Sequence, residues 1–279
     1  MHVRWLLTAV LLLAAGANAR TAERIVSLSP HLTELAFAAG AGGRVVGTVE
    51  YSDEPEAART IPRIGDAFRV DPERILALRP DVVLAWATGT PRPTIERLRA
   101  LGLDVREFDT QRIADISRAV REIGAIAGTA AAADEAADRF DHGMAELERR
   151  YGQRERLTVF LQVNTRPLYT VNRQQIMSEL VELCGGRNLF DDLNQLAPQV
   201  GLEAVIARNP DVIIVTDEGD PGAVGEWSRW RQVEAVRADN VYRLPANDLT
   251  RATTRLTQGA AALCRVLDTA RERKARRPD

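Results

Sequence analysis

Side chains that could carry out catalysis are few in this sequence and poorly spaced for that task. The 279 residues include three histidines and two cysteines, and no GxSxG, HExxH or phosphate-binding GxxxxGK[ST] motif. Residues 40–47, GAGGRVVG, resemble a dinucleotide-binding loop but lack its third glycine and follow an expected helix instead of a strand. We therefore expect no catalytic residues and no enzyme. A secreted enzyme is the alternative of a different class.

The histidines are too few for a bare metal site. His2 lies in an apolar leader, and His142 lies on a long expected helix. Receptors for zinc or manganese assemble several histidines and carboxylates, so we predict no protein metal site. His31, at the start of a helix that opens at Ser29-Pro30, could coordinate a cobalt or iron centre. The commoner role for a lone histidine there is that of a polar lining group.

Cys184 and Cys264 are the two cysteines. In an oxidising compartment an even pair favours a disulfide. A bridge that closes a loop of about 80 residues would stabilise the fold by about 4–5 kcal/mol in the chain-entropy treatment. Two buried free thiols are the alternative. Both interpretations give the cysteines a structural role.

The first residues predict export. Residues 1–19 have a basic start, an apolar run that is too short to span a bilayer, and the small-residue ending Ala17-Asn18-Ala19. We expect a signal peptide cleaved after about Ala19 and a periplasmic mature chain; an uncleaved anchor is the alternative. Removing Arg4 leaves 36 basic and 39 acidic residues, a net charge of −3. This balance gives no reason to expect nucleic acid as a partner.

Apolar strand-like segments alternate with helical ones along the rest of the chain, which predicts an α/β fold with parallel sheets. The strands are expected at residues 24–28, 44–49, 82–85, 105–108, 158–163, 212–216 and 241–244. The helices are expected at residues 30–39, 73–78, 94–101, 113–127, 130–151, 176–184, 202–207, 227–236 and 255–273.

The long helix predicts two lobes on a stiff connector. The expected parts are a signal peptide (1–19), a first lobe (20–129), the connecting helix (130–152), a second lobe (153–272) and a basic tail (273–279). The basic run 271–277 is expected to be frayed and solvated. In the helix expected at 227–236, we place Trp230 in the core and leave Trp227 unassigned. A cleft between two such lobes is a favoured ligand site.

An internal repeat supports two similar lobes. Residues 71–86, DPERILALRPDVVLAW, align without gaps with residues 201–216, GLEAVIARNPDVIIVT. Each copy reads as a short helix, a Pro-Asp turn and a buried strand. Glu73 and Glu203 occupy the same early helical position. They either stabilise the helix through its dipole, or offer one exposed carboxylate per lobe for docking.

At this point the chain resembles the periplasmic cobalamin- and siderophore-binding proteins of ABC importers, over residues 24–267. The segments that carry the resemblance are RIVSLSPHLTELAFAAG (24–40), YSDEP (51–55), the two repeats, FLQVNTRPLYT (160–170), LVELCGGRNLF (180–190) and LTRATTRLTQGAAALC (249–264). The resemblance implies two Rossmann-like lobes joined by one long helix. It also implies capture of cobalamin, with a ferric siderophore or haem as the alternative.

The resemblance implies site residues as well. It makes Glu73 and Glu203 docking residues for an ABC importer permease dimer, and it implies a Cys184–Cys264 bridge and a monomeric protein. Its cleft positions, together with neighbouring polar and aromatic side chains, give the expected ligand-binding set: Ser29, His31, Tyr51, Phe68, Trp86, Tyr169, Asp248 and Arg251.

Some of these positions have another interpretation or depart from the family pattern. Trp86 could be a core residue at a strand end. Arg251 and Arg255 could meet an anionic ligand group or pair with nearby carboxylates. Cobalamin-binding members carry tryptophan where this chain has Ala67 and Ala197, so we expect a wider pocket or another chelate.

Overall fold

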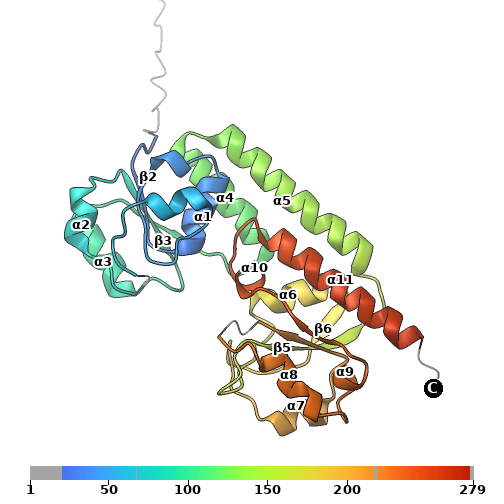
Figure 1. The fold of residues 1–279 in the computed structure, drawn as a ribbon. Coiled ribbons are helices and arrows are strands. Elements are labelled where there is room, and N and C mark those ends of the chain that lie inside the picture. Colours follow the sequence, from blue (N-terminus) through green and yellow to red (C-terminus); the bar gives the residue numbers. More distant parts are fainter. Residues whose placement is uncertain (1–20, 67, 217–218, 277–279) are drawn as a thin grey trace, which may run out of the picture.

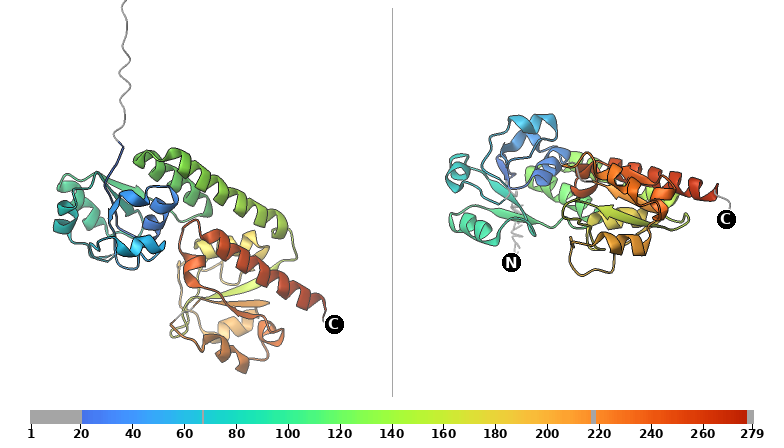
Figure 2. Two further views of the ribbon diagram at one scale, coloured as in Figure 1. Left: turned by 45° about the horizontal axis from the view of Figure 1, so that its top comes forward. Right: turned by 60° about the horizontal axis from the view of Figure 1, so that its bottom comes forward.

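The computed structural model describes residues 21–66, 68–216 and 219–276. Two α/β lobes are connected by the long helix α5 (Ala130–Tyr151), which runs along one side of both lobes (Figure 1). The last helix, α11 (Leu256–Ala275), packs against α5, and two further views show the same pairing (Figure 2). The predicted signal peptide and Ala67 lie outside the described residues.

Each lobe is built on a four-stranded sheet in which every neighbouring pair of strands is parallel. The first sheet has the order β2-β1-β3-β4 and the second has the order β6-β5-β7-β8. The strands are β1 (Ile25–Ser27), β2 (Val45–Gly47), β3 (Val82–Trp86), β4 (Val105–Phe108), β5 (Leu157–Gln162), β6 (Gly186–Asn188), β7 (Val212–Val215) and β8 (Val241–Arg243). The two sheets therefore share one topology, which confirms the predicted fold class.

Helices cover both faces of each sheet. The helices besides α5 and α11 are α1 (Pro30–Ala38), α2 (Pro72–Ala77), α3 (Arg92–Ala100), α4 (Ile113–Ala127), α6 (Ile176–Leu183), α7 (Leu202–Arg208), α8 (Ala223–Glu226), α9 (Glu234–Arg237) and α10 (Ala246–Thr250). Helices α2 and α3 pack on the outer face of the first sheet, and α7, α8 and α9 pack on that of the second. Helices α1, α4, α5, α6 and α11 enclose the inner faces.

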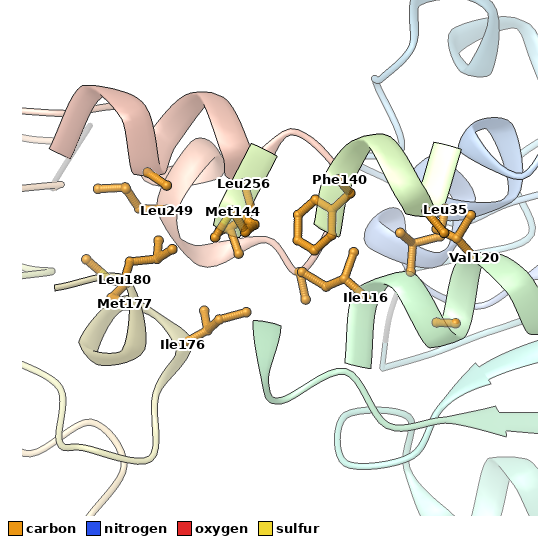
Figure 3. Close-up of a cluster of buried hydrophobic side chains, with 14 of the residues drawn as sticks. Leu35, Ile116, Val120, Phe140, Met144, Ile176, Met177, Leu180, Leu249 and Leu256 are labelled. Carbon is orange, nitrogen blue, oxygen red and sulfur yellow. The ribbon is translucent and has the colours of Figure 1, made fainter. Parts of the chain in front are cut away.

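The inner faces share one apolar core that continues from lobe to lobe. Ile116 of α4 and Phe140 of α5 belong to the same buried cluster as Ile176 of α6 and Leu256 of α11 (Figure 3). None of the described helices is both long enough and apolar enough to cross a membrane.

The internal repeat forms the same structure twice. Asp81 donates its backbone N–H to Arg24 O (2.8 Å) and accepts the Arg24 N–H on its carboxylate (2.9 Å). Asp211 does the same with Thr158, at 3.0 Å and 2.8 Å. Each Asp therefore ties the start of its own strand to the neighbouring strand of the sheet.

Four details of the predicted elements are corrected. Strand β6 and helix α10 were not predicted. The single helix expected at 227–236 is wrong, because α8 ends at Glu226 and the segment forms a 3₁₀ turn (Trp227–Arg229) and the short helix α9. Trp227 is the buried tryptophan and its indole N–H donates to Gln162 Oε1 at 2.7 Å, whereas Trp230 is only partly buried.

The prediction of a solvated basic tail is also wrong at the start of that segment. Helix α11 continues to Ala275, and Arg271 is buried with 7% of its surface exposed. Its guanidinium donates to the carbonyl oxygens of Glu155, Cys184 and Gly185 at 2.7–3.0 Å. These bonds tie the end of the chain to the second lobe, because the carbonyls they satisfy follow α5 and α6.

Candidate ligand-binding cleft

A cavity of about 410 Å³ lies between the lobes and is lined by residues of both. The lining residues are Pro30, His31, Trp86, Thr88, Thr110, Gln111, Gln174, Gln175, Ile176, Leu196, Thr250, Arg251 and Ala252. Several of the first lobe's lining residues stand at or just beyond the carboxyl ends of β1, β3 and β4. Open parallel sheets bind ligands at this edge, so the topology itself places the cleft.

Trp86 forms an aromatic wall of the cleft. It ends β3, where its backbone N–H donates to Thr90 Oγ1 at 3.0 Å. A side chain at Gly89 would collide with the indole, because a Cβ there would lie 1.7 Å from a ring carbon. Because Gly89 has no side chain, the indole fits beside it. The indole lines the cleft and also packs against the buried apolar core.

His31 meets Trp86 edge-on, with ring centroids 5.1 Å apart. Its Nε2 lies 3.2 Å from Thr110 Oγ1. Burial, and secondarily the charge of Arg251, lower the pKa of His31 from 6.5 to about 4. The imidazole is therefore neutral near pH 7. Within the described residues there is no cluster of three or more His, Cys, Asp or Glu that could hold a metal ion.

Arg251 and Arg255 pair with carboxylates across the cleft. Arg251 Nη1 donates to Glu34 Oε1 and to Asp53 Oδ1, both at 3.1 Å. Arg255 Nε donates to Glu34 Oε2 at 2.9 Å, and its Nη2 donates to Glu34 Oε1 at 3.1 Å. Arg255 Nη1 reaches Asp248 Oδ1 at 3.4 Å. Of the two roles considered for these arginines, the structure shows the ion pairing.

Three of the predicted ligand residues, His31, Trp86 and Arg251, line this cavity. Tyr51 and Phe68 lie beside the first lobe's sheet on the loops after β2 and are 76% and 74% exposed. Neither residue lines this cavity.

The other predicted residues are not among those that line the cavity. Ser29 is buried, and its Oγ has no hydrogen-bond partner among the described residues. Tyr169 is partly buried, and its backbone bridges to Asn164 and Gln199. Asp248 is partly buried against Arg255.

Sequence reasoning missed the amide and hydroxyl groups of the cleft. Thr88 and Thr110 follow β3 and β4, and Gln174 and Gln175 precede α6. The threonines carried a usable signal, because they stand just beyond strand ends. The glutamines carried none, since their position depends on how the second lobe packs against the first.

The repeated glutamates lie away from this cavity. Glu73 and Glu203 are both exposed, and each is the second residue of its helix, α2 or α7. Cys184 and Cys264 form a disulfide with an S–S distance of 2.00 Å, which confirms the predicted pairing.

Comparison with known proteins gives one consistent family. The family model described as periplasmic binding protein matches residues 25–247. A vitamin B12-binding protein of Vibrio cholerae is 32% identical over 90% of this chain and 91% of its own length. A protein of the same name from Yersinia pestis is 36% identical over 88% of this chain and 86% of its own length.

Solved structures agree. The crystal structure of the periplasmic vitamin B12 binding protein BtuF of Vibrio cholerae superposes with a TM-score of 0.82 at 32% identity, over 90% of this chain and 98% of that one. The periplasmic heme-binding protein RhuT of Roseiflexus superposes with a TM-score of 0.77 at 26% identity, over 89% and 98%.

Proposed function

The chain belongs to the periplasmic binding protein family, and from that membership and the cleft we propose that it captures a cobalamin-type corrinoid and delivers it to an ABC importer. The protein binds its cargo without chemical change. Its predicted signal peptide, cleaved after about Ala19, would place the mature monomer in the periplasm, with lobes at 20–129 and 153–272 around the connecting helix 130–152.

The observation that carries this proposal is a cleft walled by both lobes with one indole and several amide and hydroxyl groups. Its volume of about 410 Å³ is within the range of about 300–1,000 Å³ that holds drug-sized ligands. A corrinoid is larger, so part of it would stay outside this cavity. The exposed rings of Tyr51 and Phe68 offer apolar area to that part at low entropic cost.

We further infer that Glu73 and Glu203 are the docking residues. Each is exposed at the same place on an equivalent helix, one per lobe. A permease dimer presents two equivalent sites, so a protein with one carboxylate per lobe can pair with basic residues on both halves. Opening of the docked lobes by the importer would then release the cargo.

An iron chelate or haem is the second candidate cargo. The neutral imidazole of His31 in the cleft favours it, because an unprotonated nitrogen can coordinate iron.

Calorimetric titration of the purified mature protein with cyanocobalamin tests the proposal, with haem and ferric siderophores titrated in parallel. We expect saturable one-to-one binding of cyanocobalamin with a Kd of about 1 µM or tighter. If only an iron chelate gives a binding signal, the corrinoid is rejected as the cargo and the proposed transport role applies to iron. No heat from any of the chelates would reject both cargoes.

A further inference from the structure

Charge in the cleft is concentrated at one lining residue. Among the described lining residues, Arg251 alone is charged near neutral pH, since the low pKa of His31 keeps its imidazole neutral. The side chain of Arg251 is 18% exposed, so its guanidinium is held in a largely buried setting.

That charge is cancelled from the opposite lobe. Glu34 of α1 and Asp53 both accept from Arg251 Nη1, and Glu34 also accepts a bidentate pair from Arg255. With Asp248 on Arg255, the cluster holds three carboxylates and two guanidinium groups, a net charge of −1. The side chain of Glu34 is only 6% exposed, and both arginines contact its carboxylate.

Arg251 still has donors to offer. Its Nη1 makes both ion pairs, and within the described part of the chain its Nε and Nη2 make no hydrogen bond. An arginine in this state can donate to a carbonyl oxygen but adds no net positive potential to the cleft.

The uncharged polar side chains that line the cleft can hydrogen-bond to amide groups of a ligand. Gln175 Oε1 accepts the Met177 N–H at 2.5 Å, which leaves its NH₂ group to donate. Gln111 Nε2 donates to Asp109 at 3.0 Å, which leaves its carbonyl to accept. A ligand amide both donates and accepts, so it can use both kinds of group.

Building on the proposed corrinoid binding, we propose that Glu34 and Asp53 are specificity-determining residues: by neutralising Arg251, they make the cleft select chelates that carry peripheral amides over chelates that carry carboxylates. A carboxylate that enters the cleft loses its hydration and meets no uncompensated cation. An amide loses less hydration and recovers hydrogen bonds from the wall. Replacing either acid by its amide raises the net charge of the cluster from −1 to 0, which weakens that preference.

The test compares cyanocobalamin with its separated monocarboxylates, in which one propionamide is hydrolysed to a propionate. Calorimetry near pH 7 gives both affinities for the wild-type protein, Asp53→Asn and Glu34→Gln. For the wild-type protein, we expect at least one monocarboxylate to bind about tenfold more weakly than cyanocobalamin. In both variants we expect the same isomer to recover to within about threefold of cyanocobalamin.

The controls distinguish the effect of the lost acidic charge from misfolding and from a charge change elsewhere near the cleft. Glu34 is buried, so Glu34→Gln is used only if its thermal melt is cooperative; the Asp53 side chain is 48% exposed, so Asp53→Asn keeps the test open. Arg173 is exposed next to the cleft glutamines, and Arg173→Gln should leave the amide preference unchanged.

The outcomes are distinct. Equal wild-type affinity for cyanocobalamin and every monocarboxylate overturns the selectivity and leaves corrinoid binding intact. A preference that disappears in Arg173→Gln but persists in Asp53→Asn also overturns it. If the protein binds none of these corrinoids, the proposed cargo and the selectivity fail together.

Discussion

Replacing His31 by glutamine should flatten the acid side of the protein's stability profile. On folding, burial and the nearby charge of Arg251 lower the pKa of His31 from 6.5 to about 4. Between these values the unfolded chain binds a proton at His31 and the folded chain does not, so stability falls as the pH falls from about 6.5 to about 4. At about 1.36 kcal/mol for each pKa unit, the loss approaches about 3 kcal/mol below pH 4.

Urea unfolding at several pH values across this window measures the effect as the difference between wild type and His31→Gln. Glutamine can keep a hydrogen bond to Thr110, so the variant removes the titration more than the contact. His142→Gln on the exposed face of α5 is the matched control and should run parallel to wild type. If His31→Gln also runs parallel to wild type, His31 does not titrate as its burial requires and the reasoning is refuted.

Further predictions concern the cargo, the importer and the disulfide. Trp86→Ala should weaken cyanocobalamin binding at least about tenfold, or about 1.4 kcal/mol, by calorimetry; unchanged affinity would make Trp86 a core residue. Glu73→Lys combined with Glu203→Lys should preserve that affinity but abolish uptake into cells that carry the cognate importer, and normal uptake would reject the docking role. Replacing Cys184 and Cys264 by serine should lower the free energy of unfolding by about 4 kcal/mol in denaturant melts; an unchanged midpoint would contradict the structural role.

Strong local patterns account for the parts of the fold that were predictable. Helices α4 and α5 have the expected bounds because their apolar periodicity is long and Gly128, at φ 67°, ends α4 in a left-handed turn. The repeat was readable because each copy places a Pro-Asp turn between a short helix and a buried strand. Both copies turn through a left-handed residue, Arg79 or Asn209, which the sequence does not reveal.

The missed elements lacked such patterns. Strand β6 consists of Gly186, Arg187 and Asn188, none of which favours a strand; its place is set by pairing with β5. The segment after α8 was read as one helix because Trp227, Trp230 and Val233 recur at helical spacing. The indole of Trp227 instead donates to Gln162 of β5, and Trp227–Arg229 forms a 3₁₀ turn.

The cleft was the least predictable part, because its polar groups meet only in the folded chain. Glu34 and Arg255 are 221 positions apart in sequence yet form a bidentate pair. Three of the expected ligand residues do line the cavity, and each could be located without tertiary information: His31 at a helix start, Trp86 at a strand end and Arg251 just after the loop that carries Asp248.

The contacts between the lobes bear on how the cargo is released. On the cleft side Glu34 holds the two arginines of the second lobe. Near the start of α4 Glu179 accepts from Arg112 at 3.2 Å and from the Ile113 N–H at 3.0 Å. The shared apolar core also joins the two lobes (Figure 3). Spreading the lobes widely would unpair a buried carboxylate and expose apolar surface, both of which cost free energy. We therefore expect the free protein to keep its cleft geometry and to open only when an importer binds both lobes.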